Sequence, residues 1–299
     1  MAFEVISYAL GAPPNRIYTM LKLIETLQQQ SPTREVIFSL LQPDSIQESK
    51  DSAERAYGIL QNLNLISVSQ NTDEVIRVVD TSFLESFELF RLKMQQNLLG
   101  AKQQEDDNFL LSQLTAWYAI YNQEAYLMRR ESIERRFHED LYPSVIANNS
   151  TRKINDTILL SWGLWARFLG FGREYSLAGG QRKLVPNAYI RVYPLLNDIF
   201  HKDVEELPIN QFLEKLSTFC PELDGGIVYN RIYESVYNQS AINTPLSLML
   251  SSALRTLQTK GVIELINRAD ALNTRQLFPS QSYIGSVSHI RLNRENKTI

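Results

Sequence analysis

The sequence changes its hydrophobic period once within residues 1–80, and this change limits the folds that the segment can adopt. At first, apolar residues recur at three- and four-residue steps in three runs, which are separated by Pro32 and Pro43. Such steps place apolar side chains on one face of a helix, and proline interrupts helices because it lacks an N–H donor. Residues 65–68 and 75–79 are then two short runs rich in Ile and Val. Three helices followed by a β-hairpin is the order of a winged helix, so the sequence predicts one here.

The middle of the chain, residues 81–207, is predicted to be a helical bundle. Its helical runs carry too many bulky apolar residues for helices with one solvent-exposed face. Trp162 and Trp165 lie three residues apart on one predicted helix, so we expect both to face the interior. A later segment with Gly179-Gly180 is typical of a loop or hairpin.

The pattern of the first segment returns in residues 208–299. Three more helical runs precede two strand-like runs at 262–266 and 286–292. The sequence therefore predicts a mainly α fold, in which two winged-helix domains, residues 1–80 and 208–299, flank the central helical domain. Winged helices serve DNA readers and protein-docking modules alike, so this fold class does not decide the function.

Charge is distributed unevenly along the chain. The net charge of −3 gives the whole molecule no electrostatic preference for nucleic acid. Residues 129–191 nevertheless hold eleven Lys and Arg against six Asp and Glu, and residues 241–299 hold seven against three. The first hundred residues hold eight against twelve. If nucleic acid is a ligand, we expect its phosphates to bind the middle or the C-terminal end of the chain.

The residue types disfavour several classes of function. A single cysteine, Cys220, forms neither an internal disulfide nor a cysteine-based metal cluster. No run approaches the roughly 20 apolar residues of a membrane span, and no signal-peptide pattern opens the chain, so we expect a cytoplasmic protein without membrane contact. The sequence contains neither the glycine-rich motif of a phosphate loop nor that of a dinucleotide-binding site. No sequence pattern marks Cys220 or a serine as an activated nucleophile, and the three histidines are far apart in the sequence. We expect no catalytic residue, cofactor or metal, and keep an unrecognised enzyme as a third hypothesis.

Candidate phosphate contacts lie in the two positively charged segments. Arg129-Arg130 and Arg135-Arg136 alternate with glutamates, which favours ion pairs within one helix. The pair Arg182-Lys183 has no acidic neighbour in its predicted loop. The predicted C-terminal winged helix has serines and arginines on its third helix, its loop and its last strand. Such a sparse set suits contact with a phosphate backbone better than readout of bases. The predicted nucleic-acid-binding residues are Arg182, Lys183, Ser251, Arg255, Arg268, Arg275 and Arg291.

The predicted N-terminal winged helix is poorly suited to binding DNA. Its third helix offers mainly Arg55, Gln61 and Asn62, with Glu54 beside them. Its wing carries Asp73-Glu74, which would repel phosphate. Protein docking is therefore the expected role of this copy.

Three short motifs resemble one bacterial family. Pro14-Asn15-Arg16-Ile17 leads into the first helix, the run from Trp162 to Gly172 reads WGLWARFLGFG, and Pro186-Asn187-Ala188 follows. In these motifs the chain resembles the DpdG proteins, which accompany 7-deazapurine DNA-modification and restriction clusters in bacteria. The resemblance spans most of the chain. It implies a defence-linked context and supplies no catalytic residues.

Two functions of different classes remain. The first is a non-enzymatic accessory or scaffold protein of a DNA-processing or phage-defence complex, which docks other subunits and contacts the DNA backbone weakly, without sequence preference. The alternative is a DNA-binding transcriptional regulator, which would need a basic third helix and wing in one domain. The N-terminal copy lacks these, so the scaffold is the preferred hypothesis. The partner, any DNA sequence and the oligomeric state stay open.

Overall fold

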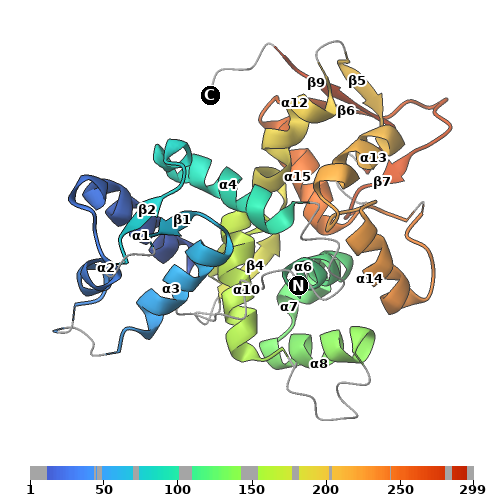
Figure 1. The fold of residues 1–299 in the computed structure, drawn as a ribbon. Coiled ribbons are helices and arrows are strands. Elements are labelled where there is room, and N and C mark those ends of the chain that lie inside the picture. The colour runs from blue at the N-terminus through green and yellow to red at the C-terminus, as the bar shows by residue number, and fades with distance from the viewer. Residues whose placement is uncertain are drawn as a thin grey trace. The chain divides into compact units, whose positions relative to one another are not determined.

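The computed structural model describes residues 12–43, 45, 49–69, 74–100, 110–142, 154–176, 182–201, 204–242, 244–279 and 285–294. This part of the chain is mainly helical with several small antiparallel hairpins, which confirms the predicted mainly α class (Figure 1). The chain divides into two compact units. The first is Met1–Asp106 with Thr157–Phe168, and the second is Asp107–Asp156 with Leu169–Ile299.

The first unit opens with the predicted order of elements. Its helices and strands are α1 (Pro14–Leu27), the 3-10 turn η2 (Gln28–Gln30), α2 (Arg34–Leu41), α3 (Asp51–Asn62), β1 (Ile66–Val68) and β2 (Ile76–Val78). The two strands pair antiparallel, with Ser67 opposite Arg77. Thr33, just before α2, forms an isolated bridge with Val75, so the segment ahead of α2 joins the hairpin on the β2 side. Strand β2 therefore lies between two partners.

Apolar periodicity explains why these segments are helical. Ile17, Met20, Leu21 and Ile24 lie on one face of α1 and are fully buried. The second helix starts at Arg34, where the Thr33 hydroxyl accepts a hydrogen bond from the N–H of residue 36 and caps the helix.

The first unit is completed by η3 (Ser82–Leu84), α4 (Phe87–Leu99) and most of α10 (Asp156–Leu169). An aromatic cluster packs these helices together. The ring centroid of Phe90 on α4 lies 5.1 Å from that of Tyr18 on α1 and 5.3 Å from that of Phe168 on α10. Trp162 and Trp165 are only 4% and 1% exposed, which confirms that both face the interior.

The second unit contains the remaining elements of the middle segment. They are α6 (Leu110–Ile120), α7 (Asn122–Leu127), α8 (Arg130–Leu141), β3 (Gly172–Ser176), β4 (Arg182–Pro186), α11 (Tyr189–Val192), η4 (Tyr193–Leu195) and α12 (Leu196–Ile199). The segment after residue 186 consists of three short helical pieces, because Pro194 has no N–H to donate within a continuous helix. The helices that were expected in one central bundle are thus divided between the two units. Hydrophobic periodicity indicates which face of a helix is buried, but it does not indicate which other element packs against that face. The three-domain division at residues 80 and 207 stays a prediction.

The C-terminal part of the second unit repeats the strand arrangement of the first. Its elements are β5 (Glu206–Pro208), α13 (Ile209–Phe219), α14 (Ile227–Tyr237), α15 (Leu248–Thr259), β6 (Ile263–Ile266), β7 (Arg275–Gln276), β8 (Ser286–Val287) and β9 (His289–Leu292). Strand β9 lies between β5 and β6 and is antiparallel to both. The last strand is therefore central, as β2 is in the first unit. Strand β5 was not expected from the sequence.

None of the helices among the described residues has the length and apolar character needed to cross a bilayer.

Candidate functional site

The structure brings two basic segments together beside the β3–β4 hairpin. Lys183 on β4 pairs across the hairpin with Tyr175. Its Nζ donates a 2.5 Å hydrogen bond to the backbone carbonyl of Met128, which lies 55 residues away between α7 and α8. Burial lowers the pKa of Lys183, and the positive charges of Arg130 and Arg129 lower it further. The adjacent Arg129 and Arg130 therefore act on Lys183, which lies more than 50 residues later in the sequence, and we name these three residues the hairpin cluster.

Two acids offset part of the charge of the hairpin cluster. Nη1 of Arg130 lies 3.0 Å from a carboxylate oxygen of Asp156, and the charge of Glu131 raises the pKa of Lys183. Arg129 is exposed. Three positive charges against two negative ones leave an excess of one, which suits weak contact with phosphate. Arg182 is the first residue of β4, and its side chain lies outside the described residues.

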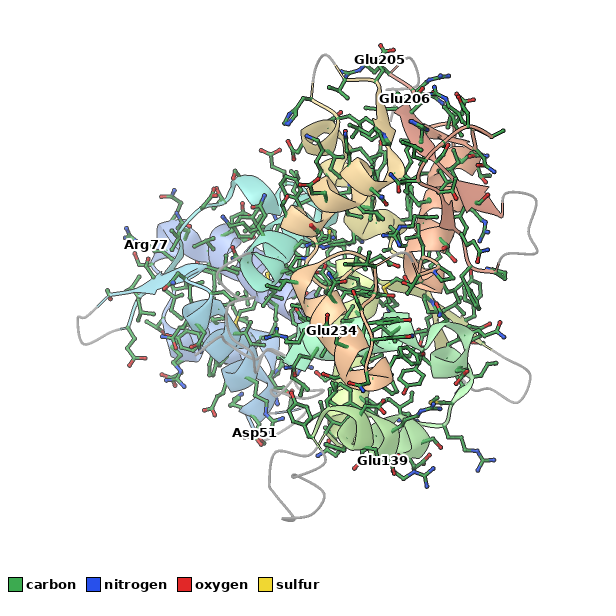
Figure 2. The ribbon with its side chains drawn as sticks, turned by 90° about the vertical axis from the view of Figure 1, so that its right-hand side faces the viewer. Asp51, Arg77, Glu139, Glu205, Glu206 and Glu234 are labelled. Carbon is green, nitrogen blue, oxygen red and sulfur yellow. The ribbon has the colours of Figure 1, made fainter. Side chains whose placement is uncertain are left out.

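The arginines of helix α8 form ion pairs, but only that of Arg135 lies within one helix as the sequence favoured. Arg135 Nε is 3.8 Å from an oxygen of Glu139, one turn along the helix, and Figure 2 shows Glu139 on the outer side of α8. Arg136 Nη1 is 3.5 Å from Glu124 on α7, and its guanidinium lies 4.4 Å from the ring centroid of Tyr121.

Two of the predicted C-terminal contacts are engaged by hydrogen bonds with the backbone of the same chain, Ser251 in the interior and Arg255 at a half-buried position. Ser251 is fully buried, and its hydroxyl accepts a 2.9 Å hydrogen bond from the backbone N–H of Phe278. Arg255 donates to the backbone carbonyls of Phe278 and Pro279 at 2.5 and 3.1 Å, and burial lowers its pKa. Direct contact of Ser251 with DNA would require the surrounding chain to move.

Two more of these residues form an ion-pair network on the β5–β9–β6 sheet. Glu206 on β5, labelled in Figure 2, lies 2.5 Å from a guanidinium nitrogen of Arg268 and 2.8 Å from one of Arg291. Arg291 also lies 2.8 Å from Glu264 on β6. Two cations and two anions leave this network neutral, so it offers phosphate no net attraction.

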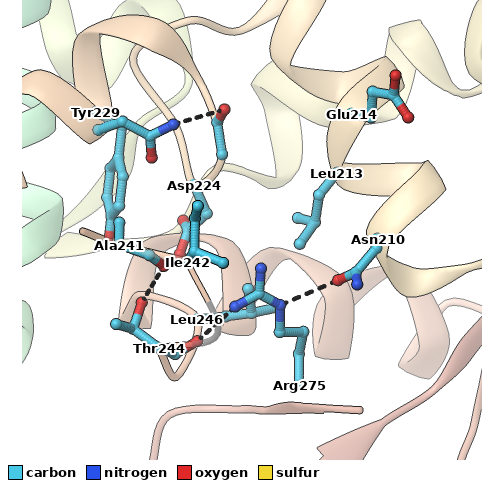
Figure 3. Close-up of a pocket in the computed structure, with 12 residues that line it drawn as sticks. Asn210, Leu213, Glu214, Asp224, Tyr229, Ala241, Ile242, Thr244, Leu246 and Arg275 are labelled. Atoms are coloured by element: carbon cyan, nitrogen blue, oxygen red, sulfur yellow. Dashed lines mark hydrogen bonds between the residues drawn. The ribbon is translucent and has the colours of Figure 1, made fainter. Parts of the chain in front are cut away.

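Arg275 lines a cavity of about 180 Å³ between α13, α14 and the adjoining loops (Figure 3). Its Nε donates to the side-chain oxygen of Asn210 and its Nη1 to the carbonyl of Thr244, each at 3.2 Å. Burial lowers the pKa of Arg275, while the charge of Asp224 raises it. The Asp224 carboxylate accepts 2.6 Å hydrogen bonds from both the N–H and the hydroxyl of Ser247, and burial raises its pKa.

Arg191 on α11 and Glu222 in the loop after α13 form a buried ion pair. Nε of Arg191 donates to Oε1 of Glu222 at 3.0 Å, and their side chains are 5% and 0% exposed. Burial raises the pKa of the neighbouring Cys220 to about 12, so its thiol is protonated at neutral pH and unreactive as a nucleophile. Nothing in the local sequence of either segment indicates this pairing.

Potential metal ligands are dispersed. Among the residues that the structure describes, no three His, Cys, Asp or Glu side chains gather as a metal site. Nε2 of the buried His138 instead accepts a 3.0 Å hydrogen bond from the backbone N–H of Ile154.

The chain matches a known protein family. A family model described as DpdG-like matches residues 3–271. Neither the curated proteins nor the solved structures gave a match.

Proposed function

Because the chain belongs to the DpdG-like family, which is linked to Dpd DNA-modification systems, we propose that it is a non-enzymatic scaffold subunit of such a system. Family membership implies association with other Dpd-system proteins. In this proposal the N-terminal region docks one of these proteins, and the second unit contacts the DNA backbone weakly and without sequence preference. Hydrolysis of ATP, or magnesium-dependent cleavage of DNA, that survived repurification would contradict the non-enzymatic part.

Strand order supports a winged helix at each end of the chain. In a winged helix, helices precede a hairpin whose last strand also pairs with the segment ahead of the second helix. Strand β2 has this position through the Thr33–Val75 bridge. Strand β9 has it through β5, which lies between α12 and α13, when α12 is taken as the first helix of the copy and α13 as the second. The C-terminal copy differs in its extra helix α14, which packs against α6 and α8.

The exposed apolar residues of α2 are the observation that carries the docking proposal. Val36 and Leu40 lie one helical turn apart and are 43% and 54% exposed. Two apolar side chains at this spacing form a ridge that another protein can cover. The first turn of α3, by contrast, carries Asp51 and Glu54, and Figure 2 shows Asp51 at the surface. A phosphate backbone would be repelled there, whereas a protein partner would not.

A single charge on this ridge should disrupt docking. We expect tagged wild-type protein to recover Dpd-system proteins from its native cells, and Leu40→Asp to lose them, because a buried unpaired carboxylate opposes association. Leu127→Asp is the matched control, since Leu127 is 59% exposed on α7 of the second unit. Recovery of the same proteins by Leu40→Asp, as judged by quantitative mass spectrometry, would refute docking through α2.

DNA binding should depend on the hairpin cluster. We expect Arg129→Ala with Lys183→Ala to weaken binding to all duplexes alike and to reduce the log–log salt slope by about 0.9 for each phosphate that the variant no longer neutralises. Fluorescence anisotropy at several salt concentrations measures both effects. Arg135→Ala, which removes a 74% exposed arginine elsewhere on α8, is the control and should change little. If Arg55→Ala instead abolished recognition of one particular sequence, the regulator would replace the scaffold.

A further inference from the structure

The cavity beside Arg275 contains a cationic group that is held in a fixed direction. Two of the three guanidinium nitrogens are engaged, Nε by Asn210 and Nη1 by the carbonyl of Thr244. The remaining nitrogen, Nη2, has no partner within the described residues and points into the space between α13 and α14 (Figure 3). An arginine fixed in this way has lost much of its conformational freedom before any ligand arrives, which favours binding.

The acidic residues of the cavity wall do not occupy this nitrogen. Asp224 directs one carboxylate oxygen to the N–H of Ser247 and the other to its hydroxyl. Glu214 is exposed on α13, and its carboxylate points away from Arg275 in Figure 3. No hydrogen bond joins Nη2 to either carboxylate, so among the described residues this donor is available to an anionic oxygen.

The size and lining of the cavity limit the ligand. A volume of about 180 Å³ is below the ~300 Å³ of a typical drug-sized site. The apolar part of the cavity wall is formed by Leu213, Ala241 and Leu246. A short alkyl stem that ends in one charged group matches these walls.

The acidic residues of the wall disfavour a ligand with more than one negative charge. Among the described residues that line the cavity, Arg275 is the one cation and Asp224 and the exposed Glu214 are the acids, and the charge of the buried Asp224 acts on the guanidinium. A phosphate dianion would bring a second negative charge toward Asp224 without a second cation to offset it. A carboxylate brings only one.

We propose that this cavity binds a monocarboxylate with a short apolar stem, whose carboxylate accepts a hydrogen bond from Nη2 of Arg275. The carboxylate belongs either to a free short-chain acid or to a glutamate side chain of a partner, since both present the same chemistry. This assignment does not rest on scaffold function or on DNA binding.

Nuclear magnetic resonance titration of the full chain tests the assignment. The probes are sodium butyrate, N-acetylglutamate amide as a blocked glutamate, and inorganic phosphate, each compared with sodium chloride at equal ionic strength. We expect a saturable shift of the Arg275 Nε–H resonance and of the amides of Gly225 and Ile242 with at least one of the two carboxylates. Butyrate binding indicates a free acid, and binding of the blocked glutamate alone indicates a partner side chain. Shifts that match those with chloride, or phosphate binding as tight as carboxylate binding, would overturn the assignment.

Variants localise the binding. We expect Arg275→Met to weaken carboxylate binding at least tenfold, as read from the Gly225 and Ile242 amides. Because Arg275 also holds two loops through its hydrogen bonds, Ala241→Leu is the second variant, and it fills the cavity without removing a charge. Arg268→Met is the matched control, since Arg268 pairs with Glu206 on the sheet and does not line the cavity. Unchanged affinity in Ala241→Leu would also overturn the assignment.

Discussion

Arg191→Met is expected to lower the free energy of unfolding by about 3–5 kcal/mol, because it leaves a buried carboxylate without its cation. In the wild type, Arg191 donates to Glu222 and to the backbone carbonyl of Phe219. The second carboxylate oxygen of Glu222 is buried and has no hydrogen-bond partner among the described residues, so the arginine is its principal compensation. Urea unfolding followed by circular dichroism measures the loss.

The loss of unfolding free energy in Arg191→Met should depend on pH, and the ionisation of Glu222 determines whether this loss grows or shrinks as pH rises. Burial raises the pKa of Glu222 above its ordinary value of 4.5, and Arg191 is the charge that lowers it. Without Arg191, the folded-state pKa stands further above the unfolded one. Below pH 4.5 the carboxyl is protonated in both states and costs little. As pH rises toward the folded-state pKa, only the unfolded chain ionises freely, so stability falls. We expect a smaller deficit at pH 4.5 than at pH 7.5.

Two comparisons separate this effect from general damage. Arg268→Met breaks a half-exposed ion pair and should cost no more than about 1 kcal/mol. The double variant Arg191→Met with Glu222→Leu removes both charges and should recover a large part of the loss, because an apolar pair of similar volume tolerates burial. A deficit of Arg191→Met that is equal at both pH values would show that Glu222 is not left as an uncompensated carboxylate.

The sequence predicted local secondary structure far better than it predicted which distant segments pack or pair with one another. The spacing of Ile17, Met20, Leu21 and Ile24 specifies both a helix and its buried face, and α1 has both. Strand β5 was missed because its three residues, Glu206–Pro208, are too few to show alternation. It exists through pairing with β9, some 85 residues later, where Glu206 also binds Arg291.

The candidate sites show the same limit. Lys183 was identified as a phosphate contact, but its association with Arg129 and Arg130 depends on the packing of the hairpin beside α7, which no local pattern encodes. Arg275 was predicted as a phosphate contact on a loop, and in the structure it lines a cavity. An arginine has the same sequence signature on a solvated loop and in a cavity wall, because only its distant neighbours differ.

Trp165→Ala is expected to cost about 3–5 kcal/mol of unfolding free energy, because it removes a large side chain from a closed interior. Trp165 is 1% exposed, and its ring meets Phe168 edge to face, with centroids 5.8 Å apart. The cluster around Phe168 also holds α4 against α10, so the cavity would open where two helices meet. Leu160→Ala on the same helix is the control, since Leu160 is 36% exposed and its truncation leaves a smaller void. Thermal and urea unfolding measure both variants. A midpoint that Trp165→Ala left unchanged, or shifted no further than Leu160→Ala did, would mean that this residue faces an open interface rather than the core of the first unit.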